Sequence, residues 1–133
     1  MGKTSIICIT PTPSRKGRNR EWSPLKSEYR KELEKLKVLI IENAPYALEN
    51  SVLEYNKWNI PTINRIVKEV LYCYGAGMKV AIQITFITIS GGYIEPNQDV
   101  IAVGGIGKGA DCAIVLKANY PEFPFSEDSE ETA

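Results

Sequence analysis

The sequence contains no histidine among its 133 residues. Histidine is the commonest general base near neutral pH and a frequent metal ligand. Its absence excludes Ser-His-Asp and Cys-His catalytic arrangements, so an enzyme built from this chain would have to use other side chains or a cofactor. No apolar run approaches the roughly 18 residues that a transmembrane helix needs. The apolar segment at the N-terminus is also too short for a secretory leader.

The chain has few cysteines and no net charge. The three cysteines, Cys8, Cys73 and Cys112, lie far apart, so no CxxC pair and no metal-ligand spacing occurs. The odd count and the lack of a leader predict a reduced, cytoplasmic setting in which the thiols act as small apolar side chains. Sixteen basic and sixteen acidic residues cancel. We therefore expect no attraction to nucleic acid or membranes, and we predict no catalytic residue and no metal ligand.

The first half of the chain predicts a strand, a basic loop, a helix and a second strand. Residues 4–9 are β-branched and apolar, and the prolines of 10–24 predict a loop. Ser23 and Pro24 together indicate the start of a helix. The helix carries apolar residues on one face, and they are Leu25, Tyr29, Leu33 and Leu36. A buried strand is expected at 37–41 and a short helix between 46 and 55.

The second half contains the clearest helical pattern of the chain, since apolar residues recur at helical spacing from Ile63 to Tyr74. The next segment, 78–92, is ambiguous. Its β-branched residues alternate as in a strand, although a helical stripe also fits. Further strands are expected at 99–103 and 111–117. Residues 126–133, SEDSEETA, predict an acidic, disordered tail after a single domain spanning 1–125.

Between the last two predicted strands lies GGIGKGAD, residues 104–111. Glycine loops that hold phosphate in Rossmann and P-loop proteins lead into a helix, whose N-terminus faces the anion. This loop leads into CAIVLK, which has the composition of a strand. Eight residues are also too few for a parallel crossover, so the loop predicts an antiparallel hairpin. Two alternatives stay open: a purely structural turn, or a turn whose N–H groups and Lys108 also contact an anion.

The last third of the chain resembles a family of small, largely uncharacterised proteins similar to the C-terminal domain of pyruvate kinase. That family ends in a pattern close to G-x-K-V, an apolar segment, A-G-x-I, and then E-x-V-I-A-x-x-G-T-x-x-G-A-D-T-A-x-V. The matching residues are Gly77, Lys79, Val80, Gly92, Ile94, Val100, Ile101, Ala102, Gly105, Gly109, Ala110, Asp111, Ala113 and Val115. Over residues 1–74 only the order of elements agrees.

The resemblance implies a three-layer α/β/α sandwich with a mostly parallel sheet and an antiparallel last strand. It also implies that 78–92 is helical, against the propensity of its residues. Members of the family begin with a further strand and helix that this chain lacks, so the sheet is expected to be incomplete. For a single chain, we expect the strands on either side of the gap to pair directly. Pyruvate kinase activity is not implied, because its catalytic residues lie in another domain.

Two functions follow as hypotheses. The first is a module that binds a small phosphorylated ligand, such as a nucleotide or flavin mononucleotide, at the carboxyl ends of the strands. Its candidate residues come from the loop after the first strand and from the glycine loop: Thr10, Thr12, Arg15, Lys16, Gly105, Gly107, Lys108 and Gly109. The alternative is a truncated or split protein without a ligand site of its own. Another copy of the chain, or a partner that donates a strand, would then complete its sheet.

Overall fold

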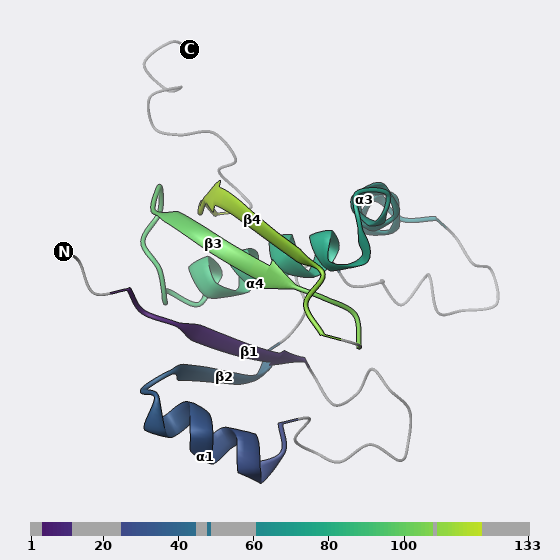
Figure 1. Cartoon of the computed structure of the whole chain (residues 1–133). Coiled ribbons are helices and arrows are strands. Elements are labelled where there is room, and N and C mark those ends of the chain that lie inside the picture. The colour runs from purple at the N-terminus through teal and green to yellow at the C-terminus, as the bar shows by residue number, and fades with distance from the viewer. Residues whose placement is uncertain (1–3, 12–24, 45–47, 49–60, 108, 121–133) are drawn as a thin grey trace. The chain divides into compact units, whose positions relative to one another are not determined.

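The computed structural model describes residues 4–11, 25–44, 48, 61–107 and 109–120 (Figure 1). These residues belong to two compact units, one within Met1–Tyr46 and one within Ala47–Ala133. Each unit is presented by itself. The helix start predicted at Ser23–Pro24, most of the helix predicted at 46–55 and the acidic tail lie outside the described residues.

The first unit contains β1 (Ile7–Pro11), α1 (Ser27–Lys35) and β2 (Leu39–Ala44). The two strands are parallel, and Cys8 lies opposite Ile40 in their register. Both strands begin about two or three residues later than the sequence predicts. For β2 the reason is visible, because the chain after α1 turns through Lys37 in a left-handed conformation, with φ of 58°. It becomes a strand only at Leu39.

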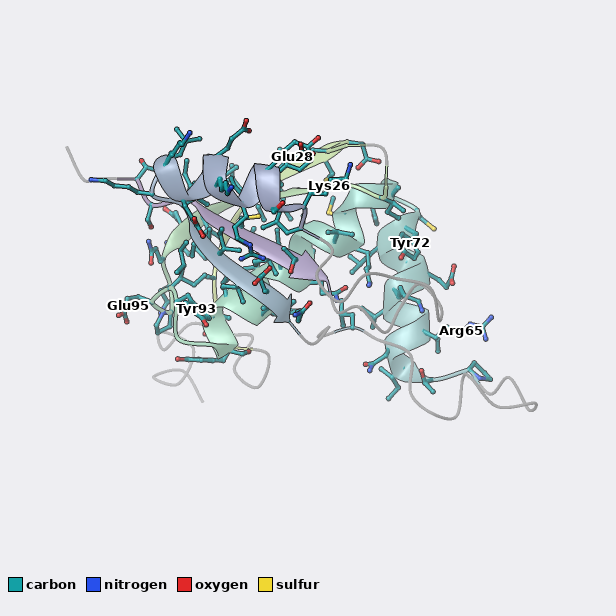
Figure 2. The ribbon with its side chains drawn as sticks, turned by 90° about the horizontal axis from the view of Figure 1, so that it is seen from below. Lys26, Glu28, Arg65, Tyr72, Tyr93 and Glu95 are labelled. Atoms are coloured by element: carbon teal, nitrogen blue, oxygen red, sulfur yellow. The ribbon has the colours of Figure 1, made fainter. Side chains whose placement is uncertain are left out.

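Helix α1 begins later than expected, and less of its predicted apolar face is buried. Its N-cap is Lys26, which makes no side-chain capping bond, and the first turn closes through a bond of 3.0 Å from the Arg30 N–H to the Lys26 carbonyl. Lys26 and Glu28 mark this end in Figure 2. The predicted apolar face is partly covered: Leu25 and Leu33 are half-buried, while Tyr29 and Leu36 are exposed.

The second unit contains α3 (Ile63–Tyr72), α4 (Ala76–Ser90), β3 (Asp99–Gly104) and β4 (Cys112–Lys117). The Thr62 hydroxyl caps α3 by accepting a hydrogen bond of 3.2 Å from the Arg65 N–H. Gly75, with φ of 128°, then separates α3 from α4 in a conformation that favours glycine. The helix predicted from the apolar spacing at 63–74 is therefore confirmed in position and type.

Segment 78–92 lies almost entirely in α4, so the helix implied by the resemblance is confirmed and the strand favoured by propensity is wrong. The β-branched residues fit the helix partly because two threonine hydroxyls bond within it. The Thr85 hydroxyl donates to the Ala81 carbonyl at 3.0 Å, and the Thr88 hydroxyl donates to the Ile84 carbonyl at 3.0 Å. Burial thus outweighs the weak strand preference of these residues.

The hairpin predicted near the C-terminus is confirmed, since β3 and β4 are antiparallel and Ile101 lies opposite Val115. Helix α4 lies along one face of this pair (Figure 1). Ala102 and Gly104 are buried on β3, whereas Ile101 and Val103, which alternate with them along the strand, are exposed. The alternation is the one expected when a sheet has one covered face.

The apolar face of α3 is placed differently from the expectation for an amphipathic helix. Ile63 is 80% exposed and Ile66 is 57% exposed, whereas Lys68 is buried. Helix α3 contacts α4, and its half-buried residues Leu71 and Tyr72 follow Lys68 in sequence; Tyr72 is labelled in Figure 2. The long methylene stem of lysine makes such burial tolerable. The periodicity predicted the helix correctly but not the side that is buried.

The strands form two separate two-stranded sheets, β1 with β2 and β3 with β4. The architecture is therefore mixed α/β, while the three-layer sandwich remains a prediction. The expected direct pairing across the missing position would join a strand of one unit to a strand of the other, and it stays a prediction.

Candidate functional site

A β-bulge stands at the carboxyl end of the parallel pair in the first unit. Ile9 pairs with Ile41 and Pro11 pairs with Ala44, so two residues of β2, Glu42 and Asn43, lie opposite the single residue Thr10. Bulges bend a strand and turn a side chain away from its regular direction, and they are frequent next to functional sites. The carboxyl ends of parallel strands are also where α/β proteins hold ligands.

The backbone of Asn43 is turned out of the regular ladder. Its φ of 54° is left-handed, a conformation that asparagine tolerates better than most residues. The Asn43 N–H donates a hydrogen bond of 3.0 Å to Oγ1 of Thr10, whose side chain is buried. A threonine hydroxyl that accepts this bond still carries a hydrogen of its own to donate. The bond therefore fixes the bulge and leaves a donor at the strand edge.

The Asn43 carboxamide oxygen, Oδ1, is buried and has no hydrogen-bond partner among the residues that the structure describes. A buried acceptor without a partner costs about 1–3 kcal/mol, because it has lost its bonds to water. Such groups are rare in folded proteins and call for a specific explanation. An unsatisfied acceptor beside a buried hydroxyl makes this edge the most distinctive polar feature of the first unit.

An ion pair borders the bulge. Nη2 of Arg30 on α1 donates to Oε1 of Glu42, and both side chains are 30% exposed. The hydrogen bond to Glu42 raises the pKa of Arg30, so the guanidinium keeps its charge throughout the accessible pH range. The pair ties α1 to the bulged strand and compensates the carboxylate that stands next to Asn43.

Cys8 lies two residues before Thr10 on β1 and is half-buried. Burial raises the pKa of its thiol, so the neutral form predominates at neutral pH. A nucleophilic cysteine needs a lowered pKa instead. Cys8 therefore packs as a half-buried apolar residue, whereas the prediction of a buried thiol is wrong for Cys73, which is exposed.

The predicted site residues are divided between the two units. Thr10 belongs to the bulge in the first unit, and Thr12, Arg15 and Lys16 lie outside the described residues. The three predicted glycines, Gly105, Gly107 and Gly109, belong to the second unit. Lys108, which lies between them, is outside the described residues. The two halves of the predicted site are thus known separately.

In the second unit the glycine loop has a clear structural role. Gly107 and Gly109 have left-handed φ values of 73° and 97°. The loop packs against the first turn of α4 so closely that a Cβ at Gly77 would collide with the Gly104 carbonyl oxygen and with Oδ1 of Asp111. The Asp111 carboxylate thus stands at the positive end of α4, which favours anions. A further anion would meet this negative charge, which favours the structural turn over an anion site, and both alternatives stay predictions.

Three contributors to the bulge were missed at the level of sequence: Arg30, Glu42 and Asn43. A signal for two of them exists, because Glu42 and Asn43 are polar residues that directly follow the apolar run VLII, residues 38–41. Polar residues at the end of a buried strand are candidates for a ligand edge. Arg30 gave no such signal, since it lies among other charged residues of α1.

No group of three or more residues suited to hold a metal ion occurs in the part of the chain that the structure describes. Among the same residues, none of the helices combines the length and the apolar character required to traverse a bilayer. No known family model matches this chain. The resemblance to pyruvate kinase C-terminal domains therefore stays a prediction that rests on residues 75–118.

Proposed function

We propose that the chain binds a small phosphorylated molecule at the carboxyl edge of β1 and β2. The observation that carries the proposal is the bulge, where an irregular backbone, a buried hydroxyl and an unsatisfied carboxamide oxygen meet at one strand edge. The sequence adds positive charge, because Arg15 and Lys16 follow β1 within five residues. Basic side chains of this kind pair with phosphate oxygens.

The test is calorimetric titration of the full chain with phosphate monoesters, including a nucleoside monophosphate and flavin mononucleotide. Arg15→Glu is expected to weaken binding about tenfold or more, because it replaces a charge-assisted bond with repulsion. Lys35→Glu is the matched control, since it reverses a basic residue at the far end of α1. Equal affinities for the two variants would contradict the proposal, as would a chain that binds none of these compounds.

Lys108→Glu examines the glycine loop separately. If the loop contributes to the site, this variant should lower the affinity for the same monoesters. Since Asp111 already places a carboxylate at α4, our proposal assigns the ligand to the bulge, and we expect the affinity to be unchanged. A loss like that of Arg15→Glu would show that the loop is part of the site.

A second candidate function is assembly, in which a partner chain completes the sheet. It is favoured by the uncovered face of the hairpin, where Ile101 and Val115 are 73% and 76% exposed. Exposed apolar residues grouped on one face often mark a contact with another protein. Sedimentation of the chain alone and with a peptide of alternating apolar residues would test this candidate. A chain that stays monomeric and does not bind the peptide would contradict the assembly function.

A further inference from the structure

The uncovered face of the hairpin in the second unit carries three cross-strand pairs. They are Asp99 opposite Lys117, Ile101 opposite Val115, and Val103 opposite Ala113. All six residues are exposed, while helix α4 lies along the other face of the hairpin (Figure 1). The face is therefore a short apolar strip with one charged pair at its end.

We infer that this strip is the contact surface between two copies of the chain, which pack with their strands aligned about a two-fold axis that runs along the hairpin. The inference is separate from phosphate binding. It rests on the assembly function proposed above and names the partner, which is a second copy of the chain and not a different protein.

The apolar pairs fit this axis. Two sheets that pack face to face keep their strands roughly aligned and lie about 10 Å apart. A two-fold axis along the strands exchanges the two sides of the hairpin, so β3 of one copy lies over β4 of the other. Ile101 of each copy then faces Val115 of the other copy, and apolar side chains cover one another at both positions.

The charged pair selects the same axis. Nζ of Lys117 lies 3.3 Å from Oδ1 of Asp99, and both side chains are exposed. In the aligned arrangement Asp99 of each copy faces Lys117 of the other, so four charges of alternating sign close one end of the contact. An axis across the strands would place the charged pair over Val103 and Ala113 of the second copy. The charges would then lose water without gaining a new partner.

The small size of the strip sets the expected strength of the contact. It consists of three cross-strand pairs, whereas stable interfaces bury about 800 Å² on each partner and involve roughly 20–30 residues a side. We therefore expect a weak dimer, with a dissociation constant on the order of 10–100 μM. Electrostatic complementarity across such a contact fixes its orientation more than its strength.

The experiment reverses single charges in the full chain and then mixes the variants. Asp99→Lys creates a chain with two positive charges at the end of the strip, and Lys117→Asp creates a chain with two negative charges. Each variant alone should associate about tenfold more weakly than the wild type, because like charges face one another across the contact. An equimolar mixture should recover at least the wild-type affinity. The readout is sedimentation velocity over a series of concentrations.

The mixing step separates the contact from a folding defect and from net charge. Both variants place like charges side by side within their own hairpin, and mixing does not remove that repulsion. A thermal melt of each variant verifies folding. The matched control is the pair Glu32→Lys and Lys31→Asp, which carries the same net charges at exposed positions of α1. Neither control variant, alone or mixed, should differ from the wild type.

The outcomes distinguish the inference from the assembly function. Association that is lost in Ile101→Thr but unchanged in both charge variants overturns the proposed arrangement and leaves assembly standing, and so do charge variants that do not recover on mixing. A wild type that stays monomeric but binds the peptide of alternating apolar residues shows that the partner is not a second copy. A wild type that stays monomeric and does not bind the peptide overturns both.

Discussion

Ile101 of β3 lies directly opposite Val115 of β4, and both side chains are about three-quarters exposed at 73% and 76%. Val103 and Ala113 form the next pair on the same face and are also exposed. Aliphatic cross-strand pairs stabilise a sheet when they are covered. When such pairs are exposed, the apolar face can associate with another chain. The unpaired backbone groups along the outer edges of a two-stranded sheet also favour association.

We therefore expect the chain to self-associate through this face. Ile101→Thr keeps β-branching but introduces a hydroxyl, so it should shift size-exclusion profiles measured with light scattering toward the monomer. Leu36→Thr is the matched control, since Leu36 is 74% exposed but lies in the first unit. A wild type that is monomeric throughout the micromolar range would contradict this prediction.

Thr10 provides a test of the bulge. Thr10→Val removes the acceptor of the Asn43 N–H and leaves a donor without its partner. We expect the free energy of unfolding to fall by about 1–3 kcal/mol, measured by urea denaturation. Thr10→Ser retains the hydroxyl oxygen and should lose less. If the valine variant were as stable as the serine variant, the hydrogen bond would contribute nothing measurable.

Gly77 tests the close approach of α4 to the glycine loop. A methyl group in Gly77→Ala would meet the Gly104 carbonyl oxygen, Oδ1 of Asp111 and Cβ of Cys112. Two of these neighbours cannot move without shifting the backbone. Overpacking of this kind costs about 1–3 kcal/mol, so the melting temperature should fall by about 4–12 °C. Ser90→Ala, at the exposed end of α4, should melt like the wild type; an unchanged Gly77→Ala would show that the packing can relax.

Cys8 makes the stability of the fold depend on pH. Burial raises the pKa of its thiol in the folded state, so the unfolded chain loses this proton first. The stabilisation is complete below the unfolded value, about 8.5, and decreases as pH rises through the folded value. Cys8→Ala should reduce the loss of stability measured between about pH 8 and 10.

The same burial predicts an order of reactivity toward a disulfide reagent at neutral pH. Cys73 should be modified before Cys8, because Cys73 is exposed to the reagent, whereas burial raises the pKa of the Cys8 thiol and a thiol reacts as its thiolate. Mass spectrometry of partially modified protein would identify the sites. Modification of Cys8 first would show that β1 opens more readily than the structure implies.

Local patterns identified most elements of this fold because caps and periodicity act over a few residues. Helix α3 and the antiparallel hairpin follow from apolar spacing and from a loop too short for a crossover. Segment 78–92 is different, since its residues fit two periods, and only the resemblance gave the correct helix. The buried side of α3 depends on α4, which no single-helix pattern contains.

The bulge could not be predicted for a related reason. The register between β1 and β2 depends on both strands together. Neither strand's sequence shows that Glu42 and Asn43 will lie opposite the single residue Thr10. The unsatisfied oxygen of Asn43 likewise depends on what surrounds it. The sequence therefore identified Thr10 at the strand edge, but it could not identify Asn43 as the residue that shares the bulge with it.

Helix α4 has a consequence for the unfolded chain. The stretch VAIQITFITI, residues 80–89, carries no charge and no proline and is rich in β-branched residues, which is the composition of segments that stack into cross-β fibrils. In the folded protein, the helical conformation of α4 prevents residues 80–89 from pairing as strands with other chains. Once the helix melts, strand formation between chains competes with refolding, so thermal unfolding at high protein concentration should end in aggregation and not in recovery.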